Sequence, residues 1–125
     1  MAFYAYSPSA GGFLGKTGKQ AEEMAANLHA VSATCKSYVG SPRFRELLNS
    51  WNDIALAEGI SASEMAYRWA AYHSLLSREH DDAMIFNASS TEQLEATLDG
   101  IERGALSDRA NAEINTIWAA IKRWS

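Results

Sequence analysis

Two short apolar runs flank a long stretch in which apolar residues recur at helical spacing. The first run, Ala2–Tyr6, is followed by Ser7-Pro8 and then by a glycine pair, residues that interrupt regular structure. An unbroken apolar run bounded by turn residues is typical of a buried strand. The sequence therefore predicts a buried strand at about residues 2–6. The second run, AMIF, predicts another at about 83–87.

Helical periodicity governs most of the remaining chain, and four to five helices are expected. Their starts carry capping signals, with Ser41 before Pro42 and with serines three residues before Glu or Gln at Ser61 and Ser90. Gly59 and Gly104 mark two helix ends. The expected helices begin near residues 20, 41, 61, 90 and 108. The residues expected on their apolar faces are Met24, Leu28, Val31, Phe44, Leu47, Leu48, Trp51, Ile54, Met65, Trp69, Tyr72, Leu76, Leu94, Leu98, Ile101, Ile114, Ile117, Trp118 and Ile121.

The order of these elements is strand, loop, helices, strand, helix, helix. Strands separated by helices indicate parallel β/α units, so the fold class is α/β with a mostly helical content. Residues 1–125 are expected to form a single domain. Two parallel strands leave both sheet edges unpaired, and an isolated pair is not stable. We therefore expect another copy, a partner chain or a rearranged helical packing to cover these edges.

Charge and composition exclude several classes of function. A net charge of −4 and a pI near 5.3 argue against binding to nucleic acid or acidic membranes. No apolar run approaches the roughly 18 residues of a membrane span, and the N-terminus lacks a signal-peptide pattern. We expect a soluble, cytoplasmic protein. The single Cys35 is expected to be an unreactive thiol, and His29, His73 and His80 lack the spacing of a metal site.

Two positions in the chain are candidates for ligand binding. Tyr6 ends the first strand, where barrel enzymes place their ligands, and its ring is suited to stacking on a planar group. The alternative is a core tyrosine followed by a turn. Asn87–Ser90 leads from the second strand into a helix whose free N–H groups favour phosphate. The alternative there is that Ser90 only caps the helix.

Four segments taken together resemble a known family. They are FYAYSPSAGGFL (3–14), SEMAYRWAAYHSLL (63–76), DAMIFNASSTEQLEATLDGIERGAL (82–106) and the last helix. In this order they resemble the closing portion of the aldo-keto reductases, especially the aflatoxin-aldehyde-reductase-like branch of filamentous fungi. Segment 20–42 is the least alike. The resemblance implies a partial (β/α)8 TIM barrel, with residues 2–6 as its seventh strand and 84–87 as its eighth.

The same resemblance implies a cofactor, NADP(H), and residues that contact it. Tyr6 matches the tyrosine that stacks on the nicotinamide ring, and Ser7 and Pro8 match the loop along the pyrophosphate. The helix start that holds the adenosine phosphate end is matched by Ser89, Ser90 and Gln93. The chain departs from the family where Asn87 replaces a glycine and Ser9 replaces a larger apolar residue.

The resemblance leaves three functional hypotheses open. The family's catalytic aspartate, tyrosine, lysine and histidine come from the first half of the barrel, and no residue here inherits those roles. The first hypothesis is a truncated aldo-keto reductase of fungal secondary metabolism that is not an autonomous reductase. The second is a non-redox enzyme (cyclase, isomerase or lyase) acting on a small carbonyl compound from a pathway. Its acid–base candidates are Tyr4, Tyr6, His73 and Asp82. The third is a non-catalytic interaction module that forms a homo-oligomer or pairs with a partner chain through its strand edges.

Overall fold

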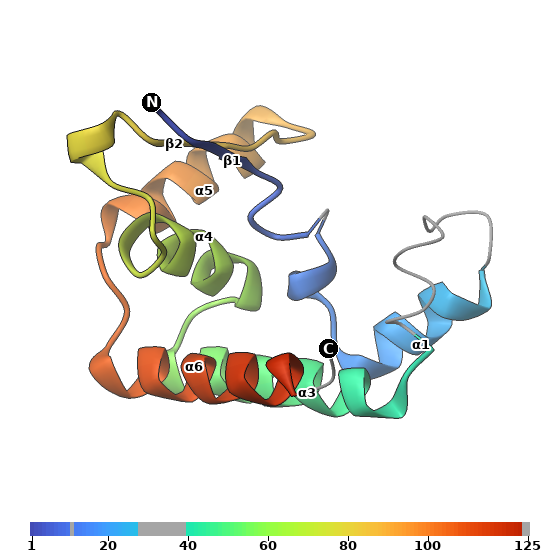
Figure 1. The fold of residues 1–125 in the computed structure, drawn as a ribbon. Helices are drawn as coiled ribbons and strands as arrows, with labels where there is room; N and C mark the ends of the chain where they lie inside the picture. Colours follow the sequence, from blue (N-terminus) through green and yellow to red (C-terminus); the bar gives the residue numbers. More distant parts are fainter. Residues whose placement is uncertain (11, 28–39, 124–125) are drawn as a thin grey trace.

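The computed structural model describes residues 1–10, 12–27 and 40–123. The described residues form two strands, five α-helices and two short 3-10 helices, which Figure 1 shows in chain order. In this order the elements are β1 (Tyr4–Tyr6), η1 (Phe13–Gly15), α1 (Gly18–Ala26), α3 (Pro42–Glu58), α4 (Ala62–Tyr72), η2 (Arg78–His80), β2 (Ala83–Ile85), α5 (Thr91–Glu102) and α6 (Asp108–Lys122).

β1 and β2 form a parallel pair, as the order of strands and helices predicts. Tyr4 lies opposite Ala83, and Tyr6 lies opposite Ile85. Asp82 extends this pairing at the start of the strands, because its carboxylate accepts the Phe3 N–H at 2.7 Å. Both strands are shorter than the predicted ranges of 2–6 and 83–87. The α/β class is confirmed: the chain is a partial (β/α)8 unit, mostly helical, with its parallel strands joined through helices.

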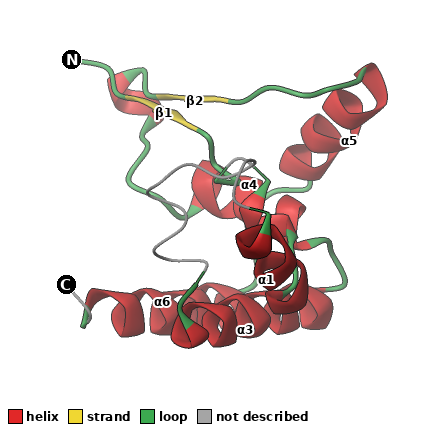
Figure 2. Cartoon of the chain, turned by 90° about the vertical axis from the view of Figure 1, so that its right-hand side faces the viewer, coloured by secondary structure: helices red, strands yellow, loops and turns green. Residues whose placement is uncertain are grey.

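The prediction that both strands are buried is wrong. Tyr4 is 61% exposed, Tyr6 is 81% exposed and Ile85 is 55% exposed. Figure 2 shows the reason: the sheet lies at one end of the molecule, and α3 and α6 lie at the other. Apolar strand sequence is typical of a sheet covered on both faces. Among the described segments none covers the face that carries Tyr4, Tyr6 and Ile85. The intervening residues Ala5 and Met84 are half-buried.

The hydrophobic core lies among the helices instead. α3 and α6 pack side by side as the lower layer in Figure 1, and α4 lies between them and the sheet. The α3 stripe is buried as predicted at Leu48, Trp51 and Ile54. Met65 of α4 is fully buried, with 0% of its surface exposed. Burial of these large apolar side chains is therefore the main stabilising contribution to the helical part.

Some predicted core positions are exposed. On α5, Leu94 and Leu98 are exposed, and on α6 the side chain of Trp118 points to solvent. The periodicity predicted these helices correctly, but part of the apolar face of α5 and of α6 is not covered by any other described segment. Tyr72 also remains exposed at the end of α4, where its hydroxyl donates to the Ile101 carbonyl oxygen at 2.7 Å.

Helix ends follow local sequence signals closely. Gly59 ends α3 in the left-handed conformation with φ of 72°, which glycine adopts without strain. The side chains of Ser61 and Ser90 cap α4 and α5. Ser41 precedes α3 without a side-chain cap bond. The first predicted helix begins earlier than expected, at Gly18, behind a Thr17–Gln20 capping box. His29 and Cys35 lie outside the described residues.

Candidate functional site

A groove of about 510 Å³ opens where β1 and β2 end. Carboxyl ends of parallel strands are where ligands bind in this class of fold. Both strand ends and the start of α5 contribute side chains to it, and α4 contributes one. The lining residues are Tyr6, Ser7, Pro8, Ser9, Gly12, Tyr67, Ile85, Phe86, Asn87, Ala88, Ser89 and Gln93. The groove thus brings together most of the residues that the sequence assigned to the cofactor; Ser90 is not among them.

The β1 side of the groove is shaped by a tight turn. Ser7 adopts φ of 56°, a left-handed conformation that is unusual for a residue other than glycine. Its carbonyl oxygen accepts the Ala10 N–H at 2.8 Å, and the Ser9 hydroxyl accepts the Gly12 N–H at 3.2 Å. The turn folds the chain back immediately after Tyr6. The Tyr6 ring is therefore left at the rim of the groove with most of its surface open.

α3 anchors the segment that follows this turn. The Trp51 indole N–H donates to the Leu14 carbonyl oxygen at 3.0 Å, and the Asn52 amide donates to that of Lys16 at 2.8 Å. The Phe13 ring packs against Phe44, with ring centroids 5.3 Å apart. The loop after β1 is thus fixed at several points to α3, whose inner face is buried in the core.

The β2 side continues from the strand into a polar segment. Phe86 contacts Tyr67 of α4 edge to face, with ring centroids 5.3 Å apart and planes inclined by 64°. Such aromatic pairs stabilise by about 0.5–1.5 kcal/mol beyond the area they bury. The pair joins α4 to the end of β2. Asn87 and Ser89 follow on the exposed side.

The start of α5 uses its polar groups internally. The Ser90 hydroxyl accepts the Gln93 N–H at 3.2 Å. The Gln93 side-chain oxygen accepts both the Ser89 N–H, at 2.7 Å, and the Ser89 hydroxyl, at 2.8 Å. Ser89, Ser90 and Gln93 are thus close together, as predicted. Ser89 donates both its N–H and its hydroxyl to Gln93, and the first turn also carries the acidic Glu92.

The predicted acid–base candidates fall in different places. Tyr6 lines the groove, whereas Tyr4, His73 and Asp82 do not. Asp82 lies at the opposite end of β2, where its carboxylate accepts the N–H groups of Phe3 and Ser77 at 2.7 and 2.9 Å. The Phe3 N–H, and then that of Ser77, lowers the pKa of Asp82 below its ordinary value. An ionised carboxylate with these bonds fastens the strand start.

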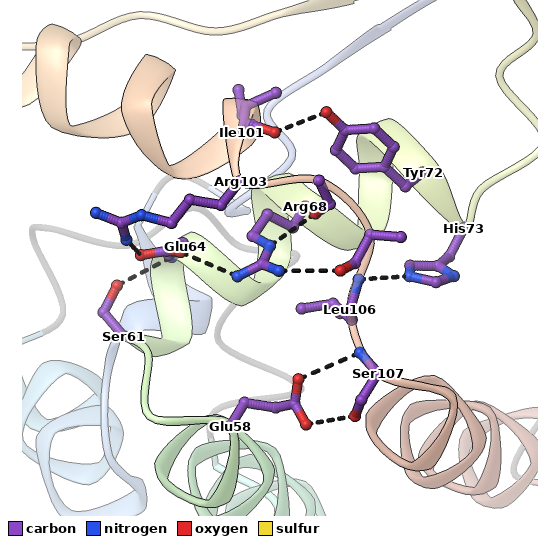
Figure 3. A network of polar contacts seen from close by, with 12 residues as sticks. Glu58, Ser61, Glu64, Arg68, Tyr72, His73, Ile101, Arg103, Leu106 and Ser107 are labelled. Carbon is purple, nitrogen blue, oxygen red and sulfur yellow. Dashed lines mark hydrogen bonds and ion pairs between the residues drawn. The ribbon is translucent and has the colours of Figure 1, made fainter.

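His73 belongs to a polar network that joins the end of α5 and the loop between α5 and α6 to α4 (Figure 3). Its Nε2 accepts the Leu106 N–H at 2.9 Å, so this nitrogen carries no proton here. Arg68 donates to the carbonyl oxygens of Gly104 and Ala105 at 2.8 and 2.9 Å. Glu64 bridges Arg68 and Arg103 at 3.2 and 2.8 Å.

At the lower edge of Figure 3, Ser107 donates its N–H and its hydroxyl to the Glu58 carboxylate. The Ser107 hydroxyl is the main reason that the pKa of Glu58 lies below its ordinary value. The network therefore ties the loop between α5 and α6 to α3 and α4. In this way it sets the position of α5, whose first turn borders the groove.

Sequence reasoning missed Tyr67 and Phe86 as groove residues. Tyr67 lies on a helix far from either strand end in sequence, and only the packing of α4 beneath the sheet brings it there. The apolar run AMIF contained Phe86, but its edge contact with Tyr67 had no signal at the sequence level. Within the described ranges, no group of three His, Cys, Asp or Glu residues is placed to hold a metal ion. No helix in those ranges is long and apolar enough to cross a membrane.

Comparison with known proteins identifies the family. The model of the Aldo/keto reductase family matches residues 1–119. Three relatives are an aldo-keto reductase from Pseudocercospora fijiensis, the oxidoreductase sirO from Leptosphaeria maculans and the human aflatoxin B1 aldehyde reductase member 4. They are 29%, 30% and 32% identical to the chain over 98%, 98% and 94% of its length.

The chain spans only 43%, 38% and 39% of these relatives' own lengths. The family match nevertheless includes both strands and the whole groove, since residues 1–119 contain β1, β2 and every lining residue. The chain belongs to the aldo/keto reductase family.

Proposed function

We propose that this chain is the ring-binding part of an aldo-keto reductase barrel, and that residues 1–125 alone reduce no carbonyl compound. The observation that carries the proposal is the groove at the ends of β1 and β2. It gathers Tyr6, Ser7 and Pro8 from one strand end and Ser89 and Gln93 from the other. These are residues that the family resemblance assigns to the cofactor. Tyr6 presents an open aromatic face on which a planar ring stacks.

The absence of autonomous reduction is proposed from what the family's chemistry requires. The resemblance assigns the aspartate, tyrosine, lysine and histidine of the reducing centre to strands before the matched portion. The chain spans about two fifths of the relatives that it matches. Turnover with NADPH then needs those strands, whether they belong to the same polypeptide or to another chain.

The cofactor implied by the family, NADP(H), fits the groove only in part. Tyr6 is suited to the nicotinamide ring. The phosphate end is less suited, because Ser89 and Gln93 already bond each other. None of the described lining residues carries a positive charge. Phosphate groups in proteins are usually held by Arg, Lys or free backbone N–H groups.

Partners are proposed from the exposed strands. Phe3, Tyr4 and Ile85 are exposed apolar side chains on or next to the two strands, whose outer edges have no neighbouring strand among the described residues. A second copy or another chain that adds strands to β1 and β2 would cover them. We also propose a role in fungal secondary metabolism, which the resemblance to the fungal branch and the two fungal relatives support. Joint expression with a biosynthetic gene cluster is the test of that role.

The ring-binding proposal is tested with N-benzyl dihydronicotinamide, an uncharged analogue that lacks the phosphates. We expect it to bind the chain, and we expect Tyr6→Leu to weaken binding at least fivefold. Tyr4→Leu is the matched control, because Tyr4 is exposed on the same strand but lies outside the groove. Equal affinity of the Tyr6 and Tyr4 variants would contradict the proposal. Rapid consumption of NADPH with nitrobenzaldehyde by the chain alone would contradict the proposal that residues 1–125 alone reduce no carbonyl compound.

A non-redox activity on a carbonyl compound is the second candidate. It is favoured by two phenol groups in one groove, those of Tyr6 and Tyr67. Neither hydroxyl has a hydrogen-bond partner among the residues that the structure describes. Such a hydroxyl donates to a carbonyl oxygen and makes the neighbouring C–H more acidic, so that a base from the solvent removes the α-proton and returns a deuteron. The test is exchange of the α-hydrogens of a ketone for solvent deuterium, which Tyr67→Phe should abolish. Exchange no faster than in buffer would exclude this activity for that ketone.

A further inference from the structure

The charge of the groove differs from what a phosphorylated dinucleotide requires. Its lining consists of aromatic, small and neutral polar side chains, and none of the described lining residues is Asp, Glu, Lys, Arg or His. A site for a multiply charged anion normally offers cations or unoccupied N–H donors. Here the side that would receive the phosphates carries an acidic residue, Glu92, in the first turn of α5.

The hydrogen-bonding state of this side gives the same result independently. A ligand phosphate at Ser89 has to displace the Gln93 side-chain oxygen from both the N–H and the hydroxyl that it accepts, at 2.7 and 2.8 Å. The Ser90 hydroxyl already accepts the Gln93 N–H as the helix cap, and its own O–H is a separate donor. Breaking these existing hydrogen bonds costs free energy, which offsets part of the binding free energy that the new contacts to the phosphate contribute.

No Lys, Arg or His of the described part of the chain lines the groove. Arg68 and Arg103 pair with Glu64, and Arg45 pairs with Glu22 at 2.8 Å. The groove lining itself is therefore neutral.

We infer that the groove selects an uncharged, planar ring compound bearing a carbonyl group, and that it disfavours NADP(H) and other anions. This rests on the proposed ring-binding role of Tyr6 and adds the charge class of the ligand. The ring lies against Tyr6 and near the edge-to-face pair of Tyr67 and Phe86. The hydroxyls of Tyr6 and Tyr67 supply donors that suit a carbonyl oxygen.

The inference is tested with a matched pair of probes, coumarin and coumarin carboxylate, which differ by one negative charge. Equilibrium dialysis against the purified chain is expected to show coumarin binding at least fivefold more tightly than its carboxylate. NADPH is expected to bind no better than the carboxylate. Tyr6→Leu should weaken coumarin binding, and Tyr4→Leu should not.

An experiment that introduces a positive charge into the groove separates this inference from the proposed function. Asn87→Lys places a cation in the groove lining and is expected to tighten NADPH and coumarin carboxylate by about two- to fivefold, while coumarin changes little. Asn115→Lys on α6 is the charge-matched control outside the groove. Tyr6-dependent binding of NADPH as tight as that of coumarin would overturn the inference while leaving ring binding intact. Failure of every probe to bind, or binding indifferent to Tyr6→Leu, would overturn both.

Discussion

Arg68 is the side chain on which the arrangement of α4, α5 and α6 depends most directly. It is only 12% exposed at its side chain and donates to three acceptors. These are the carbonyl oxygens of Gly104 and Ala105, at 2.8 and 2.9 Å, and the Glu64 carboxylate at 3.2 Å. Replacing it by methionine keeps most of the packing volume and removes all three donors. Glu64 keeps its other partner, Arg103.

The size of the effect follows from the solvent exposure of each partner. A hydrogen bond to a charged group contributes about 1.5–3 kcal/mol. The Ala105 carbonyl lies in an exposed residue and regains water when Arg68 is removed, whereas Gly104 is half-buried. We therefore expect Arg68→Met to lower the free energy of unfolding by about 2–3 kcal/mol. That is a large fraction of the roughly 5–15 kcal/mol by which native proteins are stable.

Urea unfolding followed by tryptophan fluorescence measures this effect. With a slope of about 2 kcal/mol/M, the midpoint should fall by about 1 M. Arg109→Met is the control, because Arg109 is 62% exposed at its side chain, pairs with Glu113 at 3.5 Å and adds only a longer-range attraction to Glu58. Exposed pairs of this kind contribute about 0.3–0.5 kcal/mol. If both variants shift the midpoint equally, the reasoning that the guanidinium clamps the loop is refuted.

Three further predictions concern pH, packing and capping. The pKa of Glu58 is lowered, so its bonds to Ser107 stabilise the fold above pH 4.5 and are lost as the pH falls through the folded-state pKa. Glu58→Gln should therefore unfold at a lower temperature than the parent at neutral pH. In strong acid the two proteins should unfold at nearly the same temperature. Gly100→Ala should destabilise the fold despite the better helix propensity of alanine, because the added Cβ would lie 3.0 Å from Glu64 Cγ. In a Glu64→Ala background the same change should stabilise the fold by up to about 1 kcal/mol. Ser90→Ala should cost about 1 kcal/mol of stability by thermal unfolding, and a loss under 0.3 kcal/mol would show that the cap contributes little.

Local features of the fold could be predicted because their causes lie within a few residues. The helix end at Gly59 and the cap at Ser90 both depend on adjacent backbone groups, and both are present in the structure. The strands were recognised because their apolar runs are short and end in turn residues. Their exposure could not be read from the same runs. An apolar strand sequence indicates only that the strand is suited to burial. Whether the strand is buried depends also on another segment that covers it.

The groove was predictable only in part for a related reason. Its two strand ends could be expected to meet, since parallel strands place their carboxyl ends at one edge. The family resemblance then named Tyr6 and Ser89. Tyr67 lines the groove because of the way α4 packs. That packing depends in turn on contacts such as the one between Arg68 and Gly104, which are 36 positions apart in sequence. No local pattern records a contact of this kind.

The availability of the α5 start for an anion likewise depends on hydrogen-bond pairings rather than on composition. The sequence around residue 90 has the serines of a phosphate site, and its pattern alone fits an anion as well as it fits a helix cap. In the structure the Ser89 hydroxyl and N–H both donate to the Gln93 side-chain oxygen, which favours the helix-cap use over an anion site. Gln93→Ala would release the donors of Ser89 and should therefore raise affinity for anionic ligands, even though it removes a residue that the family resemblance assigns to cofactor binding. If Gln93→Ala instead weakens NADPH binding, the side chain contacts the cofactor directly, and the serines act as the resemblance implies.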